Sequence, residues 1–131
     1  MEKIVWTDAK YSVGNAQIDN QHKYLVKQLN RLIALQKQRG NKTLQKNILG
    51  DLEKYVEQHL VYEENLLHKV GYPNVDEHEQ LHSQYMMELE MWAVMIDDDD
   101  PNILKRMCHF LQTWLTEHIV GEDMKFKKYV S

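Results

Sequence analysis

Apolar residues recur at spacings of three and four along most of this chain, which is the period of one buried face of an α-helix. The first helix is predicted to begin at Ile18, with Asp19 as its cap or in its first turn, and to end at the Gly-Asn pair of residues 40–41. The second is predicted to begin near Thr43 and to stop at the Gly-Tyr-Pro sequence of residues 71–73.

Two further helices follow the same pattern. The third is predicted to begin after Asn74 or Asp76, and a run of aspartates at 97–100 ends it; we interpret this run as a solvated turn and not as a cation site. Asp100 as cap with Pro101 at the first helical position is a strong start signal for the fourth helix. Four such segments joined by short loops predict an all-α protein, an up-down-up-down four-helix bundle.

The two ends of the chain differ from these segments. Residues 1–17, with Trp6, Tyr11 and Val13, show no helical period, and we expect an extended N-terminal arm packed across the bundle. The tail after Asp123 is amphipathic and is predicted to form a short C-terminal helix. Residues 1–131 are expected to form one domain, since a chain of 131 residues is long enough to bury a core.

Composition narrows the classes of function. The net charge is -4, so the chain lacks the excess of basic residues that nucleic-acid binding requires, and no nucleic-acid partner is expected. No apolar run reaches the ~20 residues of a membrane span, and the first residues lack the layout of a secretory signal, so we expect a cytoplasmic protein without membrane contact. The single cysteine, Cys108, excludes an internal disulfide and is expected to be packed in the core.

Histidines provide the candidate chemistry. His59 and Glu63 are four residues apart, as are His78 and His82, so each pair shares one helix face. Seven donors fall on the inward faces of the predicted helices: His22, His59, Glu63, His78, His82, His118 and Asp123.

Two other histidines do not share the inward faces of their helices. His68 lies nine residues after His59, and His109 lies nine residues before His118. At about 100° per residue, nine residues turn a helix through about 900°, half a turn beyond two full turns. His68 and His109 are therefore predicted to point outward.

Five buried imidazoles and two buried carboxylates are costly without a common partner, and metal ions are the simplest one. Seven donors are too many for a tetrahedral zinc site, and structural zinc sites usually use cysteine. Two ions about 3.5–4 Å apart share carboxylate bridges, and a set of imidazoles and carboxylates suits iron, although manganese or cobalt also accept it.

This set of donors resembles the signature of the hemerythrin family. All seven signature positions are present: His22, His59-x-x-x-Glu63, His78-x-x-x-His82 and His118-x-x-x-x-Asp123. The flanking residues also look like those of single-domain bacterial hemerythrins: Trp6, Tyr11-Ser-Val-Gly14, Ile18-Asp19, Gln21-His22 and Trp114. The resemblance covers essentially the whole chain.

The resemblance implies two iron ions with an oxo or hydroxo bridge. One iron would be bound by His78, His82 and His118, the other by His22 and His59, while both carboxylates bridge the pair. Counting donors then leaves one open position, on the second iron, where the family binds dioxygen. The implied function is reversible dioxygen binding for storage, transport or delivery, not catalysis, with an unknown oxygenase or redox protein as recipient.

The surroundings of the open iron are expected to be apolar. The candidates for this oxygen pocket are Leu25 near His22, Leu60 beside His59, and Trp114, Leu115 and Ile119 near His118; for each one alone, a place in the bundle core is an equal alternative. Tyr62, beside Glu63, is a candidate hydrogen-bond donor to the ligands, or simply a packed ring.

Two other functions remain open on this scaffold. One is a di-iron enzyme, an oxidase, a peroxidase or a nitric-oxide-handling protein; di-iron enzymes typically use a Glu-rich set with Glu-x-x-His pairs, whereas here histidines outnumber carboxylates five to two. The other is an oxygen sensor that acts through a partner protein, since this chain has no room for an output domain.

Overall fold

The structure is a computed structural model that describes residues 3–36, 42–95 and 102–131. Across these ranges the chain forms helices and no strand. The all-α prediction is therefore confirmed. None of the helices in these ranges is both long and apolar enough to cross a membrane.

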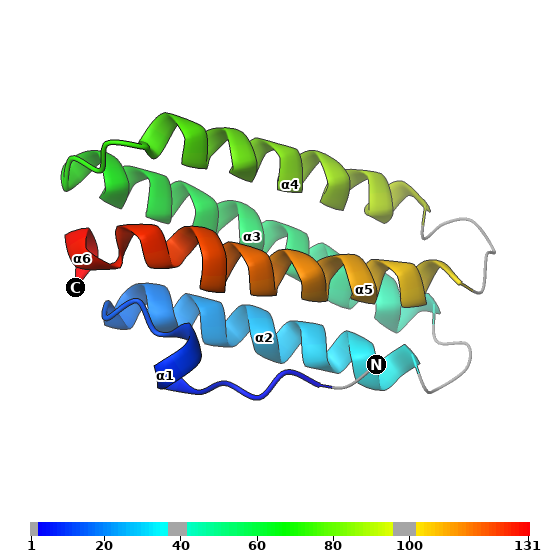
Figure 1. Cartoon of the computed structure of the whole chain (residues 1–131). Coiled ribbons are helices and arrows are strands. Elements are labelled where there is room, and N and C mark those ends of the chain that lie inside the picture. Colours follow the sequence, from blue (N-terminus) through cyan, green and yellow to red (C-terminus); the bar gives the residue numbers. More distant parts are fainter. Residues whose placement is uncertain (1–2, 37–41, 96–101) are drawn as a thin grey trace.

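Four long helices form a bundle: α2 (Ala16–Gln36), α3 (Lys42–Lys69), α4 (Val75–Met95) and α5 (Ile103–Thr116). Successive helices run in opposite directions, as Figure 1 shows. Helix α3 packs against α2 and α4, and α5 contacts the same two helices, so α2 and α4 lie diagonally across the bundle. This is the predicted up-down-up-down arrangement.

The N-terminal arm is not extended throughout. It contains a single helical turn, α1 (Asp8–Tyr11), closed by a hydrogen bond from the Tyr11 N–H to the Thr7 carbonyl. Ahead of this turn the arm is held along α2, because the side-chain amide of Asn30 both accepts from the N–H of Ile4 and donates to its carbonyl, each at 2.9 Å. Short single turns carry too few residues to show a hydrophobic period, which is why the sequence did not reveal this one.

Helix α2 begins at Ala16, two residues before the predicted start. Its cap is Asn15, whose Oδ1 accepts the N–H of Ile18 at 3.1 Å. Asp19 lies in the first turn, one of the two predicted alternatives, and its carboxylate accepts the N–H of Val13 at 2.9 Å. Asp19 thus ties the arm to the helix and does not cap it.

The other helix ends agree with the sequence signals where the structure describes them. Helix α3 ends at Lys69, and Gly71 follows with a φ of 73°, the left-handed conformation that closes many helices. Helix α4 begins directly after Asn74. The predicted signals at 40–41 and 97–101 lie outside the described residues.

The last long helix loses its regular α-helical form after Thr116. Helix α5 is followed by a π-helical turn, η1 (Glu117–Glu122), then by the 3₁₀ turn η2 (Asp123–Phe126) and the short helix α6 (Lys127–Val130). The short C-terminal helix is therefore confirmed. The π-helical turn was not predicted, and it bears directly on the site below.

Candidate metal centre

The seven predicted donors form one buried polar layer inside the bundle. Each of the seven side chains is at most 3% exposed. Apolar clusters lie on both sides of the layer. A large cluster fills the bundle towards the end that carries Leu35 and Ile103, and a small one closes the end near the C-terminus with Ile18, Leu67 and Phe126. The polar layer is thus sealed from water along the bundle axis.

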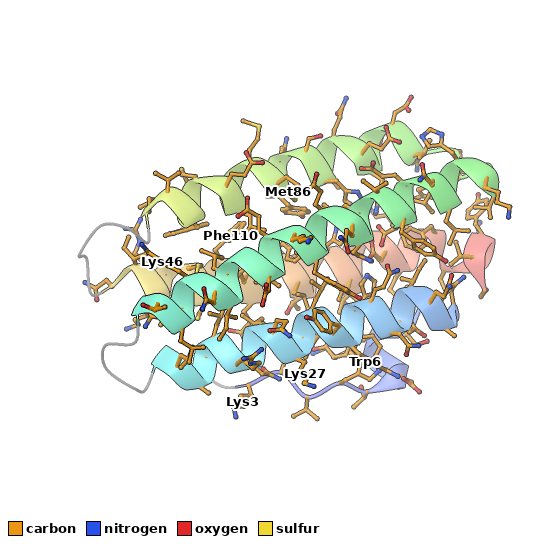
Figure 2. The ribbon with its side chains drawn as sticks, turned by 180° about the vertical axis from the view of Figure 1, so that it is seen from behind. Lys3, Trp6, Lys27, Lys46, Met86 and Phe110 are labelled. Atoms are coloured by element: carbon orange, nitrogen blue, oxygen red, sulfur yellow. The ribbon has the colours of Figure 1, made fainter. Side chains whose placement is uncertain are left out.

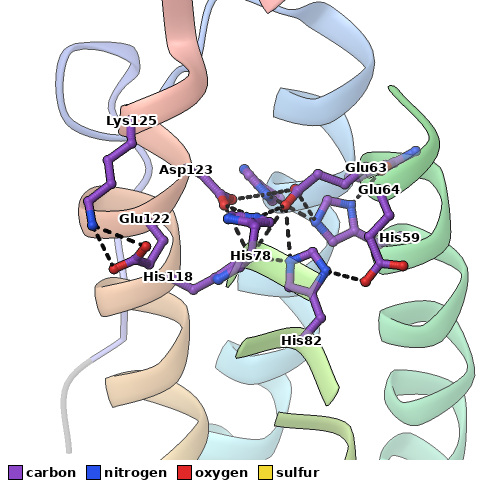
Figure 3. A network of polar contacts seen from close by, with 11 residues as sticks. His59, Glu63, Glu64, His78, His82, His118, Glu122, Asp123 and Lys125 are labelled. Carbon is purple, nitrogen blue, oxygen red and sulfur yellow. Dashed lines mark hydrogen bonds and ion pairs between the residues drawn. The ribbon is translucent and has the colours of Figure 1, made fainter. Parts of the chain in front are cut away.

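The donors divide into two groups that share one carboxylate. Figure 3 shows the network that they form. Ligand atoms that lie within 4.8 Å of one another come from Glu63, His78, His82 and His118 in one group, and from His22, His59 and Glu63 in the other. Both groups could hold a metal ion, and the predicted number of two ions stays a prediction.

Glu63 turns one oxygen towards each group. Its Oε1 lies 2.6 Å from Nε2 of His78 and 3.2 Å from Nε2 of His82. Its Oε2 lies 3.1 Å from Nε2 of His59 and 3.6 Å from Nε2 of His22. A carboxylate in this position can bridge two cations.

Asp123 is placed in the same way on the other side of the layer. Its Oδ1 lies 3.1 Å from Nε2 of His118 and 3.3 Å from Nε2 of His78. Its Oδ2 lies 3.0 Å from Nε2 of His22. The two carboxylates therefore give both groups two oxygens, while imidazoles number three in one group and two in the other.

Several of these buried atoms make no hydrogen bond within the described residues. They include both oxygens of Asp123 and Oε2 of Glu63, although imidazole nitrogens lie close to them. The imidazole nitrogens lie close to these oxygens but not at the angles of hydrogen bonds, because the nitrogens and oxygens all point towards the same space between the helices. Buried acceptors without a proton donor are costly, and cations in that space would satisfy them. The side chains thus fit a metal centre.

The outer nitrogens of two imidazoles support this interpretation. Nδ1 of His59 donates to Oε1 of Gln21 at 2.5 Å, and Nδ1 of His82 donates to Oε1 of Glu64 at 2.9 Å. A neutral imidazole that donates through Nδ1 has a free lone pair on Nε2, the nitrogen that faces the centre. Such outer partners orient metal-binding histidines in proteins.

The pKa values reflect a strongly anionic pocket. Burial lowers the pKa of His22, but the carboxylates of Asp123 and Glu63 outweigh it and raise the pKa to about 9. The same balance raises the pKa of His78 to about 10. At His59 burial prevails over the nearby Glu63 carboxylate, and the pKa is lowered. Burial also opposes ionisation of the two carboxyl groups, but the facing imidazoles hold their pKa values below the usual range. Without metal, protons on His22 and His78 therefore balance the charge of the two carboxylates, a role that metal cations would take over.

The two excluded histidines lie on the surface, as their spacing predicted. His68 is 53% exposed, and its Nε2 lies 2.5 Å from Oε1 of Glu79. His109 is also exposed, on the outer side of α5. Glu79 is therefore occupied by an outward histidine and does not belong to an inward Glu-x-x-His pair.

The five candidate pocket residues are all buried in the large apolar cluster, and their role stays a prediction. Trp114 stacks on the ring of His118, with centroids 5.7 Å apart, so it lies beside the group of three imidazoles. A narrow apolar pocket, which leaves no room for a water molecule, adjoins it and is lined by Val56, Tyr85, Leu89, Phe110, Leu111 and Trp114. The hydroxyl of Tyr62 donates a hydrogen bond to Oε1 of Gln17, and among the described residues it makes none to a predicted metal ligand.

Sequence reasoning did not assign the roles of Gln21 and Glu64. Both residues are polar on helix faces that a period-based analysis counts as surface, and both are indeed only half-buried. Gln21 adjoins His22 and Glu64 adjoins Glu63, which was the available signal. Their partners lie 38 and 18 residues away, so only the packing of the helices pairs them.

Comparison with known proteins agrees with this geometry. Residues 13–130 match the model of the hemerythrin HHE cation binding domain. A bacteriohemerythrin of Clostridium acetobutylicum is 29% identical over 129 residues, which cover 94% of this chain and 98% of that protein. A bacteriohemerythrin of Campylobacter jejuni is 29% identical over 131 residues, covering 98% of this chain and 92% of the relative.

A further relative and a solved structure are also similar. A hemerythrin-like protein of Naegleria gruberi is 28% identical over 120 residues, which cover 92% of this chain and 88% of that one. The crystal structure of wild-type hemerythrin matches this fold with a TM-score of 0.87 at 22% identity, covering 99% of each chain. Because the family model spans most of its length and describes a cation-binding domain, the chain belongs to the hemerythrin family.

Proposed function

We propose that this protein binds dioxygen reversibly at a pair of iron ions, for storage, transport or delivery. The observation that carries the proposal is the unequal division of donors around two shared carboxylates. One group has three imidazoles and two carboxylate oxygens, and the other has two imidazoles and two carboxylate oxygens.

The smaller number of imidazoles in one group would leave a coordination position open on its metal ion. If a solvent-derived bridge supplies one further ligand to each ion, the larger group reaches six ligands and the smaller reaches five. Six ligands close an octahedral site, whereas five leave room for a small molecule, and an open position distinguishes working metal sites from structural ones. The open position would belong to the ion held by His22 and His59.

The protein's own contribution is to hold the donors and to exclude water. Glu63 and Asp123 each contact both groups, so the two ion positions would not separate without a movement of α3 or of the start of η2. The apolar clusters on both sides of the layer keep solvent away. Iron bound there would supply the reversible electron transfer to dioxygen, and the buried surroundings favour release over further reaction.

The histidine-rich donor set favours a carrier over an oxygen-activating enzyme. Ferritin-like di-iron proteins use four glutamates, two of which belong to Glu-x-x-His pairs. Here the one Glu-x-x-His spacing on α4, Glu79 to His82, fails because Glu79 pairs with the exposed His68. Fewer anionic ligands stabilise highly oxidised iron less well, so the enzyme alternative has weaker support.

The test is an oxygen cycle on the loaded protein. The chain is reconstituted with ferrous iron without oxygen, its iron content is measured, and visible absorption is recorded as oxygen is admitted and then removed. We expect about two irons per chain and an absorption that appears with oxygen and disappears on its removal over repeated cycles. Irreversible oxidation in the first cycle, or sustained consumption of oxygen or peroxide with a reductant, would favour the enzyme instead.

A further inference from the structure

An apolar stripe lies on the outer surface of α4. Met87, Met91 and Val94 are four and then three residues apart, so they share one helix face. Their exposed fractions are 70%, 51% and 72%, which is unusual for three neighbouring apolar side chains on a monomer's surface. These three residues are called the α4 stripe.

Acidic residues flank the α4 stripe. Glu88 and Glu90 lie beside it on α4, and this helix, Val75–Met95, contains no lysine or arginine. Glu53 and Glu57 add two carboxylates from the neighbouring helix α3. The pKa of Glu53 is raised, by partial burial first and then by the charges of Glu90 and Glu57, which places these three carboxylates in one cluster.

The opposite side of the bundle carries a groove of the opposite charge. It runs between the N-terminal arm and α2 and has a volume of about 600 Å³. Its apolar lining comes from Ile4, Val5, Trp6, Val26 and Ala34. Its cations are Lys3, Lys27 and Arg31, none of which pairs with a carboxylate in the ranges that the structure describes. These eight residues are called the α2 groove.

The two surfaces face away from each other, since α2 and α4 lie diagonally across the bundle (Figure 1). Figure 2 shows Lys3, Trp6 and Lys27 along the arm and α2, on the side away from α4. One chain therefore cannot fill its own groove with its own stripe. A second copy can.

We propose that the α4 stripe of one copy docks into the α2 groove of another copy. The apolar side chains of the stripe would fill the apolar floor of the groove, and the flanking glutamates would meet its three cations. Such contact between two different faces is heterologous, and because the faces point in opposite directions it adds copies in an open row. Neither surface contains a predicted metal ligand, so this association does not depend on what the metal centre binds.

The area of three exposed side chains and a shallow groove is small, so the association should be weak and salt-sensitive. Sedimentation velocity of the full chain from micromolar to millimolar concentration measures it. We expect the average mass to rise with concentration at low salt and to return towards the monomer at high salt. A monomer at all concentrations would overturn the proposal.

Two variants identify the faces. Met87→Glu with Met91→Glu removes the stripe and leaves the groove, whereas Lys27→Glu with Arg31→Glu reverses the groove and leaves the stripe. Each variant alone should stay monomeric. Mixed together, they should form a dimer and nothing larger, because one intact stripe meets one intact groove and the two altered faces repel each other.

The matched control is Lys127→Glu with Lys128→Glu, which makes the same change in net charge as the groove variant but lies on α6. It should associate like the unaltered chain. Equal loss of association in the control would mean that net charge and not the groove is responsible. Failure of the mixture to dimerise, with both variants folded by circular dichroism, would likewise overturn the proposal.

Discussion

The backbone N–H of Asp123 donates to the carbonyl of His118, five residues earlier, in the π-helical turn η1. On an α-helix, five residues turn through about 500°, so the two side chains would point about 140° apart. In a π-helical turn, residues joined by i→i+5 hydrogen bonds lie about one turn apart, on nearly the same face. This turn therefore brings both side chains into the metal centre, where His118 Nε2 and Asp123 Oδ1 are 3.1 Å apart.

We first predict that metal binding requires His118 and Asp123 to lie on the same helix face. Deleting Gly121 leaves Asp123 four residues after His118, and four residues on a regular α-helix turn through about 400°, back to nearly the same face. Gly121 is exposed with no neighbouring atom where a Cβ would lie, so its removal costs little packing. The deletion should keep stoichiometric iron.

Insertion of one alanine after Gly121 is the paired variant. It places Asp123 six residues after His118, which neither an α-helix nor a π-helical turn accommodates on one face, so iron content should fall. Iron analysis of both folded proteins makes the comparison. Full iron in the insertion variant would contradict the role given to the turn.

The second prediction concerns the ligands themselves. His118→Ala and Glu63→Ala should abolish stoichiometric iron binding, because the first removes one imidazole and the second removes the carboxylate shared by both groups. The exposed residues provide controls: His68→Ala and His109→Ala should bind iron as the unaltered chain does. Metal loss in either control would refute the assignment of helix faces.

The third prediction concerns Glu64. Its carboxylate orients His82 from outside the centre at 2.9 Å, and Glu64→Ala should weaken metal binding by about 10- to 100-fold without abolishing it. Competition with a chelator measures the affinity. Glu79→Ala is matched to it, since it also removes a glutamate partner of a histidine, but that histidine is outward. Equal weakening in both variants would show a general effect of charge.

The fourth prediction is a loss of stability of the metal-free chain at high pH. His22 and His78 have folded-state pKa values of about 9 and about 10, above their unfolded values. A raised pKa contributes stability that is complete below the unfolded value, near 6.5, and is lost as pH rises through the folded value. The urea midpoint should therefore fall between about pH 7 and pH 10.

Acid should also destabilise the metal-free chain. Glu63 and Asp123 have lowered pKa values, so their contribution is present above the unfolded values and is lost as pH falls through the folded ones. Metal-loaded protein serves as the control, since the cations replace the protons and the alkaline fall should disappear. An alkaline fall of equal size in the loaded protein would contradict this origin.

The fifth prediction uses the single cysteine. Cys108 is fully buried in the large apolar cluster, and burial raises the pKa of its thiol to about 11. Thiolates are the reactive form, so a thiol reagent at neutral pH should modify Cys108 only when the bundle opens. The labelling rate should therefore follow global unfolding across a urea titration. Rapid labelling in the native state would show local opening of α5.

Much of the fold followed from helical period and end signals. Rotation by about 100° per residue placed His68 and His109 outside and five other histidines inside, and this needs no knowledge of neighbouring helices. The same arithmetic could not reveal the π-helical turn, because it assumes one regular geometry throughout. It also missed the cap Asn15 and the short helix α1, which depend on single hydrogen bonds in the arm.

The sequence by itself determined which side chains enter the bundle, since burial of an apolar helix face is a periodic property of the local chain. The tertiary structure decided how those side chains meet. That Glu63 and Asp123 each divide their oxygens between two groups of histidines, and that Gln21 and Glu64 hold two rings from outside, depends on the rotation and offset of packed helices. Residues far apart in the sequence acquire these distances only when the helices pack, so no local pattern encodes them.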